Sequence, residues 1–120
     1  MSFTIPPNET LGQKQRRFVK MLGALIDWAY QNGYELSEGE GKRTQQQAMW
    51  DAAHGSGIQH SNHIIQLAHD FNVYKNGVWL SDAKQYPDLC AYWKSLAPDA
   101  CAGADWGDSD HFSIAYQGRK

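Results

Sequence analysis

The chain has 120 residues, which suits one domain, because two separate cores of half that size would bury too little surface to be stable. Hydrophobic residues make up 42% and charged residues 20%, the composition of a folded protein rather than a disordered one. The net charge of −2, with no long basic run, argues against a nucleic-acid-binding protein. We therefore expect a single domain over residues 1–120 that binds no nucleic acid.

The sequence also bears on where the protein is made. No apolar stretch approaches the roughly 20 residues that span a bilayer, and residues 1–10 lack the charged and then apolar order of a signal peptide. We therefore expect synthesis in the cytoplasm without a membrane span. Cys90 and Cys101 match neither a CxxC metal motif nor a redox motif. Reduced thiols are expected, with a disulfide as the alternative for a protein that works outside the cell.

Two helices are predicted in the first half of the chain. Thr10 and Gln13 form a capping box, and the helix that follows ends at Asn32-Gly33. Its apolar residues recur at helical spacing: Phe18, Met21, Leu22, Leu25, Ile26 and Ala29. A second capping box, Thr44 with Gln47, predicts a helix that ends before the glycines at 55–57, after a polar loop over residues 38–42.

The second half of the chain predicts a small sheet. Residues 67–74 alternate between apolar and polar, and Asn76-Gly77 then predicts a tight turn into a second strand over residues 78–80. A further helix is predicted around residues 89–96, and after a loop rich in Ala, Gly and Asp a last strand covers residues 111–116. The predicted class is α+β, with the N-terminal helices packed on a small antiparallel sheet.

Histidines and carboxylates gather in two distant places. Four of the five histidines lie between positions 54 and 69, and His111 begins the last predicted strand beside Asp108 and Asp110. If the apolar residues of both strands face the core, Asp70 and His111 both face away from it. Two histidines and a carboxylate leave zinc with an open position for water, as hydrolysis requires. Each residue alone also fits an ordinary role, a structural histidine or a solvated acid.

These residues resemble a known family. Ser61-Asn62-His63 with Ala68 and Asp70 is similar to the S-x-H-x-x-G-x-A-x-D motif of the zinc D-alanyl-D-alanine carboxypeptidases, and residues 108–111 are similar to their D-x-x-H motif. That family includes the L-alanyl-D-glutamate endopeptidases that bacteriophages use as endolysins. Arg43-Thr44 with Gln47 is similar to a further segment of it, so the resemblance spans roughly residues 10–116. The family's glycine falls at Gln66 here, where a side chain must be tolerated.

The resemblance implies a hedgehog/DD-peptidase-like fold and a set of site residues. His63, Asp70 and His111 would bind one zinc ion, and Asp108 would be the general base, with Asp110 as the less favoured candidate because it neighbours His111 on a strand. Arg43 would hold a substrate carboxylate or the oxyanion of the transition state, unless it is a plain surface charge. The residues expected to contact substrate are Ser61, Gln47 and Trp106, although Gln47 also fits a capping role alone. Core packing is the default for Trp50, Trp79, Trp93 and Trp106, and of these Trp106 is the one expected to line the cleft.

The function that the resemblance implies is hydrolysis of the stem peptide of bacterial peptidoglycan by a zinc metallopeptidase. We expect an L-alanyl-D-glutamate endopeptidase of phage or prophage origin, a monomer that reaches the cell wall after a holin-type partner opens the membrane. The alternatives are a D-Ala-D-Ala carboxypeptidase or dipeptidase, and a zinc-binding module on the same fold that has lost catalysis.

Overall fold

The computed structural model describes residues 2–39 and 62–120. In these ranges two α-helices pack on a five-stranded antiparallel sheet, which confirms the predicted α+β class. The helices are α1 (Leu11–Gln31) and α3 (Pro87–Ser95), with short 3-10 helices η1 (Ala83–Gln85) and η2 (Gly103–Trp106). The strands are β1 (Tyr34–Glu38), β2 (Ala68–Lys75), β3 (Val78–Leu80), β4 (Ala100–Ala102) and β5 (His111–Ile114). The helix predicted from Thr44 lies outside the described residues.

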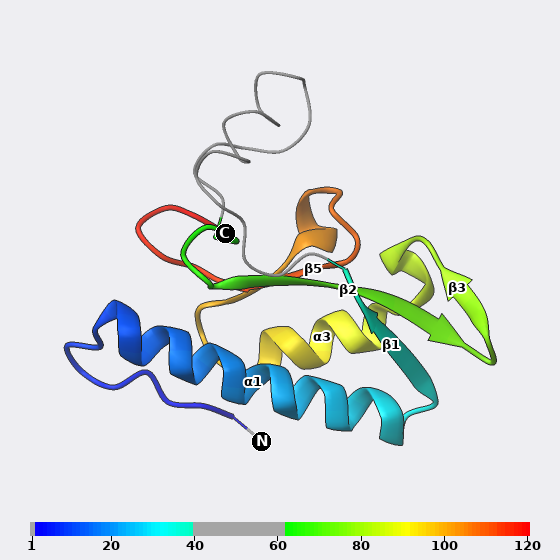
Figure 1. Ribbon diagram of the computed structural model, residues 1–120, viewed down its shortest axis with the longest axis horizontal. Coiled ribbons are helices and arrows are strands. Elements are labelled where there is room, and N and C mark those ends of the chain that lie inside the picture. Colours follow the sequence, from blue (N-terminus) through cyan, green and yellow to red (C-terminus); the bar gives the residue numbers. More distant parts are fainter. Residues whose placement is uncertain (1, 40–61) are drawn as a thin grey trace.

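β2 is the strand that organises the sheet. Its residues 71–75 pair with β1 along one edge, while along the other edge residues 68–70 pair with β5 and residues 73–75 pair with β3. β4 completes the sheet by pairing with β5. Because α1 and α3 lie on the same side of the sheet (Figure 1), the other side of β2 and β5 carries neither of them. Asp70 and His111, which are paired across these two strands, lie on that second side.

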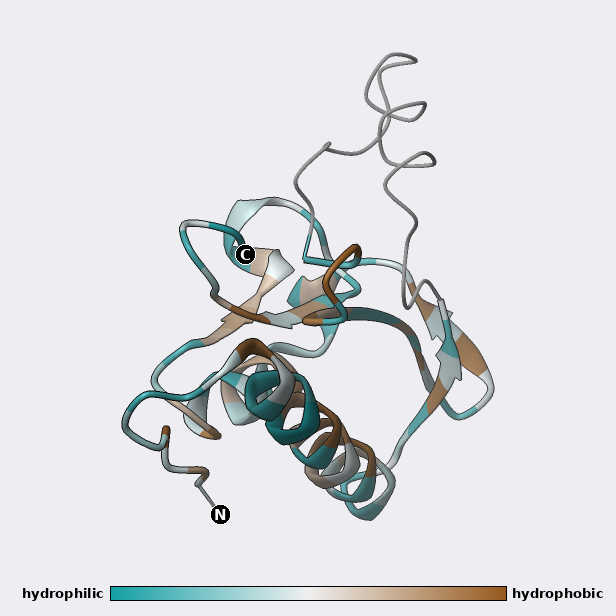
Figure 2. Cartoon of the chain, turned by 60° about the vertical axis from the view of Figure 1, so that its left-hand side comes forward, coloured by the Kyte–Doolittle hydropathy of each residue, from teal (hydrophilic) through white to brown (hydrophobic). Residues whose placement is uncertain are grey.

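Helix α1 forms as its sequence predicts. The Thr10 hydroxyl accepts a hydrogen bond from the Gln13 backbone N–H at 3.1 Å, and the Gln13 side chain accepts one from the Thr10 N–H at 2.8 Å. The helix ends where Gly33 takes a φ of 85°, a conformation that glycine adopts without strain. Hydrophobic residues line one side of the helix (Figure 2), although Ile26, predicted on the apolar stripe, is 39% exposed.

The predicted hairpin is confirmed. Asn76 and Gly77 join β2 to β3 with φ values of 53° and 76°, the two left-handed residues that a type I′ turn requires. Trp79 was predicted to pack in the core, and this is wrong, because its side chain is 59% exposed. The reason is register: Trp79 pairs with Tyr74, and Tyr74 faces away from the helices, so Trp79 does too.

Two strands were not predicted. β1 is a short strand at the sheet edge, and the segment after Pro98, predicted as a loop, contains β4 and η2. The predicted last strand ends at Ile114 rather than at residue 116. β4 has only three residues, Ala100–Ala102, and small side chains give no alternating pattern. It is held from outside the strand: the Trp93 indole N–H donates to the carbonyl of Cys101 at 2.9 Å and to that of Ser113 at 3.0 Å.

The core lies between the helices and the sheet. Its largest fully buried side chains come mostly from α1, α3, β2 and β5, and the rest from the segments that flank them: Met21, Leu25, Leu89, Trp93, Val73, Phe112 and Ile114, with Leu67, Tyr86 and Leu96. Trp93 contacts Phe18 and Phe112 edge-on, at centroid distances of 5.8 and 6.0 Å. Both cysteines are free thiols. Neither described α-helix is long and apolar enough to cross a membrane.

A partly buried ion network ties α1 to the segment before β4. Arg17 contacts Glu9 at 2.7 Å and Asp99 at 2.6 Å, and Lys14 contacts Asp99 at 2.7 Å. Hydrogen bonding to Arg17 lowers the pKa of Glu9. Burial acts to raise the pKa of Asp99, but the contacts with Arg17 and Lys14 outweigh it and lower the pKa.

Stability is therefore expected to fall in acid. Both carboxyl pKa values are lower in the folded than in the unfolded state, so the network stabilises the fold above about pH 4 and is lost as the pH falls through the folded pKa values. Urea unfolding between pH 6 and pH 2 should show a decreasing midpoint. The Glu9→Gln variant should show a smaller decrease, and an equal decrease would contradict this assignment.

Candidate metal centre and its surroundings

The three predicted metal ligands come together in the structure. His63 lies in the turn that precedes β2, Asp70 is on β2, and His111 is the first residue of β5. Asp70 and His111 are paired across the two strands, so their side chains leave the sheet on the same face. One ligand atom from each of the three residues lies within 4.8 Å of the other two. Residues 48 positions apart in the chain thus meet at one point.

The geometry of this group fits a small divalent cation. Oδ1 of Asp70 lies 3.2 Å from Nε2 of His63 and 3.6 Å from Nδ1 of His111. Ligand atoms about 2.0–2.1 Å from a tetrahedral zinc ion are about 3.3 Å apart, which is close to these two distances. Oδ1 of Asp70 and both ring nitrogens of His111 are buried without a hydrogen-bond partner in the described ranges. A shared cation would satisfy atoms whose isolation otherwise costs about 1–3 kcal/mol each.

The charge state of Asp70 also fits a metal ligand. Burial acts to raise the pKa of this carboxyl, but the contacts with His111 and His63 outweigh it and lower the pKa to about 2. Asp70 is therefore a carboxylate at neutral pH, as metal binding requires. The two imidazole rings meet edge to face, with centroids 5.2 Å apart.

A second acid lies beside the group. Oδ2 of Asp108 is 3.6 Å from Nδ1 of His111, and the Asp108 side chain is 49% exposed, so water and substrate can reach it. Asp110 lines a neighbouring cavity together with Asn72 and Tyr86. Burial and the negative charge of Asp70 raise the pKa of Asp110. Of the two acids weighed for the role of base, Asp108 is the one placed against His111.

Trp106 lies beside the group, and its predicted contact with substrate stays a prediction. Its ring meets His111 at a centroid distance of 5.3 Å and is 41% exposed. Lys120 lies 5.2 Å above the same ring. Arg43, Gln47 and Ser61 lie outside the described residues, so their predicted roles remain predictions.

The turn that carries His63 is anchored to the strand that carries His111. The Asn62 side chain is fully buried and donates from Nδ2 to the carbonyl of Ile114 at 2.8 Å. The backbone carbonyl of Asn62 accepts a hydrogen bond from the Leu67 N–H at 2.9 Å. Gln66, at the position of the glycine in the motif that the sequence resembles, takes a φ of 59°, a left-handed conformation that glycine adopts more readily than other residues. Asn62 occupies the x position of the S-x-H motif, for which the motif specifies no residue type, so the sequence analysis assigned it no role.

Two glycines allow the backbone to approach the group closely. A side chain at Gly103 would collide with the carbonyl of Asp108 and approach Cβ of His111 to 2.6 Å. A side chain at Gly39 would lie 3.0 Å from Cβ of Asp70. The packing of β1 and η2 against these strands creates both requirements, and neither is visible in the sequence, where Gly103 belongs to an unpatterned loop.

The fold is shared with a solved peptidase. The structure resembles the L-Ala D-Glu endopeptidase ChiX of Serratia marcescens with a TM-score of 0.67 over 97% of this chain and 92% of that one, at 16% sequence identity. No protein-family model and no curated protein matches the sequence. Together the match and the observed topology show that this chain has the fold of an L-Ala D-Glu endopeptidase.

Proposed function

We propose that the protein is a zinc-dependent peptidoglycan peptidase that hydrolyses the stem peptide, at the bond between L-alanine and D-glutamate. The observation that carries the proposal is the convergence of His63, Asp70 and His111 with Asp108 beside them. The shared fold with ChiX and the motif resemblance support the substrate class.

The proposed chemistry divides between the metal ion and Asp108. A divalent cation held by His63, Asp70 and His111 would polarise the peptide carbonyl and activate water. Asp108 takes the proton from the attacking water and passes it to the amine of the leaving group. Its half-exposed carboxylate can reach solvent and substrate, and its contact with His111 holds it at the edge of the group.

Other residues are proposed to hold the substrate. Arg43 would bind a carboxylate of the stem peptide or stabilise the oxyanion, because a guanidinium donates two parallel hydrogen bonds to such groups. Ser61 and Gln47 would hydrogen-bond the substrate backbone, and Trp106 would cover one side of the reacting bond. Only Trp106 of these four is among the described residues, where it contacts His111.

We also propose the biological setting that the resemblance suggests, an endolysin of phage or prophage origin that acts as a monomer. Such an enzyme acts on the wall after a holin-type protein has opened the membrane. Expression in the bacterial cytoplasm should leave cells intact, and co-expression of a holin should lyse them. Lysis that never depends on the holin would contradict this setting.

The proposed activity is tested by digesting purified peptidoglycan with the protein, with and without a chelator. We expect the metal-loaded protein to release fragments with a new N-terminal D-glutamate, because the L-alanyl bond is cut. Chelation should abolish this release, and added Zn²⁺ should restore it. Metal content of the purified protein, measured by mass spectrometry, should approach one ion per chain.

Other results would contradict specific parts of the proposal. Release of free D-alanine would indicate a carboxypeptidase instead of the endopeptidase. Bound metal without any hydrolysis would indicate a binding module on the same fold. Hydrolysis that persists after complete metal removal would contradict the proposed role of His63, Asp70 and His111.

A further inference from the structure

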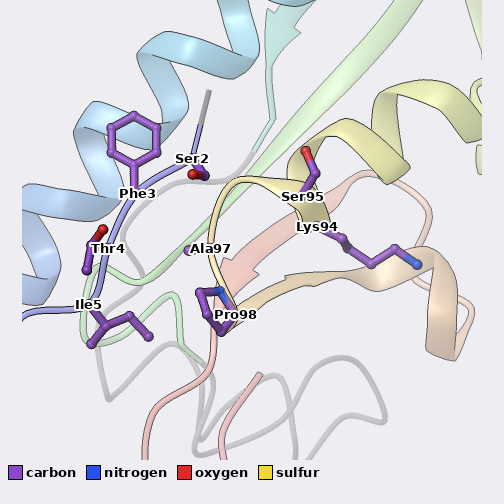
Figure 3. Close-up of a pocket in the computed structure, with 8 residues that line it drawn as sticks. All are labelled: Ser2, Phe3, Thr4, Ile5, Lys94, Ser95, Ala97 and Pro98. Atoms are coloured by element: carbon purple, nitrogen blue, oxygen red, sulfur yellow. The ribbon is translucent and has the colours of Figure 1, made fainter.

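Two cavities differ in their relation to the candidate metal group. One, of about 590 Å³, lies between residues 2–5 and the C-terminal end of α3 (Figure 3). Its lining holds no imidazole and no carboxylate, and its charged side chain, Lys94, pairs with Asp105 at 3.2 Å. No lining residue belongs to the candidate site, so this cavity offers the proposed substrate no recognisable contact.

A second cavity, of about 290 Å³, is lined by residues that neighbour two of the candidate ligands in the sequence. It fills the gap along β2 between the part that pairs with β5 and the part that pairs with β3. Asp110, which precedes His111, and Asn72, two residues beyond Asp70, both line it. The full lining is Asn72, Val73, Trp79, Leu80, Ser81, Tyr86, Gly107, Ser109 and Asp110.

Strand register places two residues of this lining, Asn72 and Trp79, on the face of the candidate site. Asp70, Asn72 and Tyr74 alternate along β2, so all three point to one face. Trp79 pairs with Tyr74 and therefore shares that face. With a rise of about 3.3 Å per residue, the face extends about 7 Å from Asp70 to Asn72 and about 13 Å to Tyr74.

This spacing matches the distance from the scissile bond to the glycan. In peptidoglycan, the scissile bond joins L-alanine to D-glutamate. The L-alanine is in turn linked through a lactyl group to an N-acetylated sugar. The L-alanine and the lactyl group are two extended units of about 3.5 Å each, so the sugar begins about 7 Å from the scissile bond. The far edge of the sugar ring lies a few ångströms beyond that point. A substrate bound at the metal group can therefore lay this sugar between Asn72 and Trp79. The cavity volume is near the lower end of about 300–1,000 Å³ for small-molecule sites, which suits one ring.

The chemistry of the lining favours a sugar over the other end of the stem peptide. Ser81 and Asp110 offer hydroxyl and carboxyl groups, and Asn72 offers its amide oxygen, since its Nδ2 donates to Oγ of Ser37 at 3.3 Å. Among the described residues that line the cavity there is no Lys, Arg or His. D-Glutamate and the diamino acid after it carry carboxylates, which would find no cation here. A sugar is uncharged, its hydroxyls pair with such polar groups, and its C–H face packs on an aromatic ring. Trp79, at 59% exposure, presents such a ring to solvent.

We propose that this cavity binds the N-acetylated sugar to which the stem peptide is attached, with Trp79 as the platform beneath its ring. The inference rests on the proposed function and deepens it. It also fixes the direction of the substrate: the glycan lies toward the β2–β3 hairpin, and the carboxylate-bearing residues lie on the other side of the metal group.

The test compares two substrates that differ only in the sugar. One is N-acetylmuramyl-L-Ala-D-Glu-diaminopimelate, and the other is the same tripeptide with a plain N-acetyl group. We expect the wild-type protein to cleave the sugar-bearing substrate with a kcat/KM about tenfold higher, equivalent to about 1.4 kcal/mol. Trp79→Ala should bring the ratio of the two kcat/KM values close to one, and Trp79→Phe should keep part of the preference.

Val78→Ala is the matched control. Val78 is 62% exposed in the same hairpin but pairs with Lys75, so it faces the opposite side of the sheet. The substrate ratio of this variant should equal that of the wild type. A wild-type ratio of one, or a ratio unchanged by Trp79→Ala, would overturn the sugar subsite and leave the peptidase proposal intact. Failure to cleave either substrate would instead contradict the proposed function and the subsite with it.

Discussion

Replacing Asp108 with Asn is expected to slow peptidoglycan hydrolysis by about 10²–10⁴-fold, the contribution of a positioned general base. The amide has nearly the shape of the carboxylate but cannot accept the proton of the attacking water. His63, Asp70 and His111 are unchanged in the variant, so its metal content should equal that of the wild type. Hydrolysis rates and metal content measured on the same preparations check both statements.

Asp105→Asn provides the control for this experiment. Asp105 is three residues away, is 55% exposed and pairs with Lys94, an exposed ion pair that contributes little. Its rate should stay within about twofold of the wild type. Asp110→Asn tests the competing acid, which lines the neighbouring cavity and should lower the rate less than Asp108→Asn does. Unchanged hydrolysis in Asp108→Asn, or loss of its metal, would show that the assigned role is wrong.

Gly103→Ala is expected to weaken metal binding although Gly103 offers no ligand atom. The added methyl group would collide with the Asp108 carbonyl and lie 2.6 Å from Cβ of His111. Both neighbours are fixed, since the Asp108 N–H donates to the Gly103 carbonyl at 2.8 Å and the His111 N–H to the Asp108 carbonyl at 3.2 Å. We expect a loss of about 1–3 kcal/mol in the free energy of unfolding and about 10–100-fold in Zn²⁺ affinity. Calorimetric titration and urea unfolding measure the two effects.

Gly23→Ala is the matched control for this substitution. Gly23 lies within α1, and an added Cβ would meet no atom within 4 Å. Alanine favours a helix over glycine by about 1 kcal/mol, so this variant should be more stable and bind Zn²⁺ as the wild type does. A Gly103→Ala protein with normal stability and affinity would show that η2 can move away from β5 without disturbing the site.

The sequence predicted the secondary-structure elements that are specified by a few neighbouring residues. The capping box at Thr10 and the left-handed Gly33 define α1, and Asn76-Gly77 defines the hairpin, because backbone geometry at these positions depends on the residue itself. β1 and β4 were missed, since short strands are stabilised by their neighbours in the sheet rather than by their own composition. Trp79 was misplaced because hydrophobicity alone does not specify which face of a strand a residue occupies.

The sequence by itself determined the kinds of residue at the candidate site, and the alternation of β2 and β5 placed Asp70 and His111 on one face. Only the tertiary structure decided that His63 joins them, because its position depends on a turn held to β5 by the Asn62 side chain. It also decided that Asp108 contacts His111, that glycine is required at position 103 and that a cavity lies beside the group. The physical reason is that these contacts are made between segments far apart in the chain. Their distances are set by the packing of the secondary-structure elements against one another.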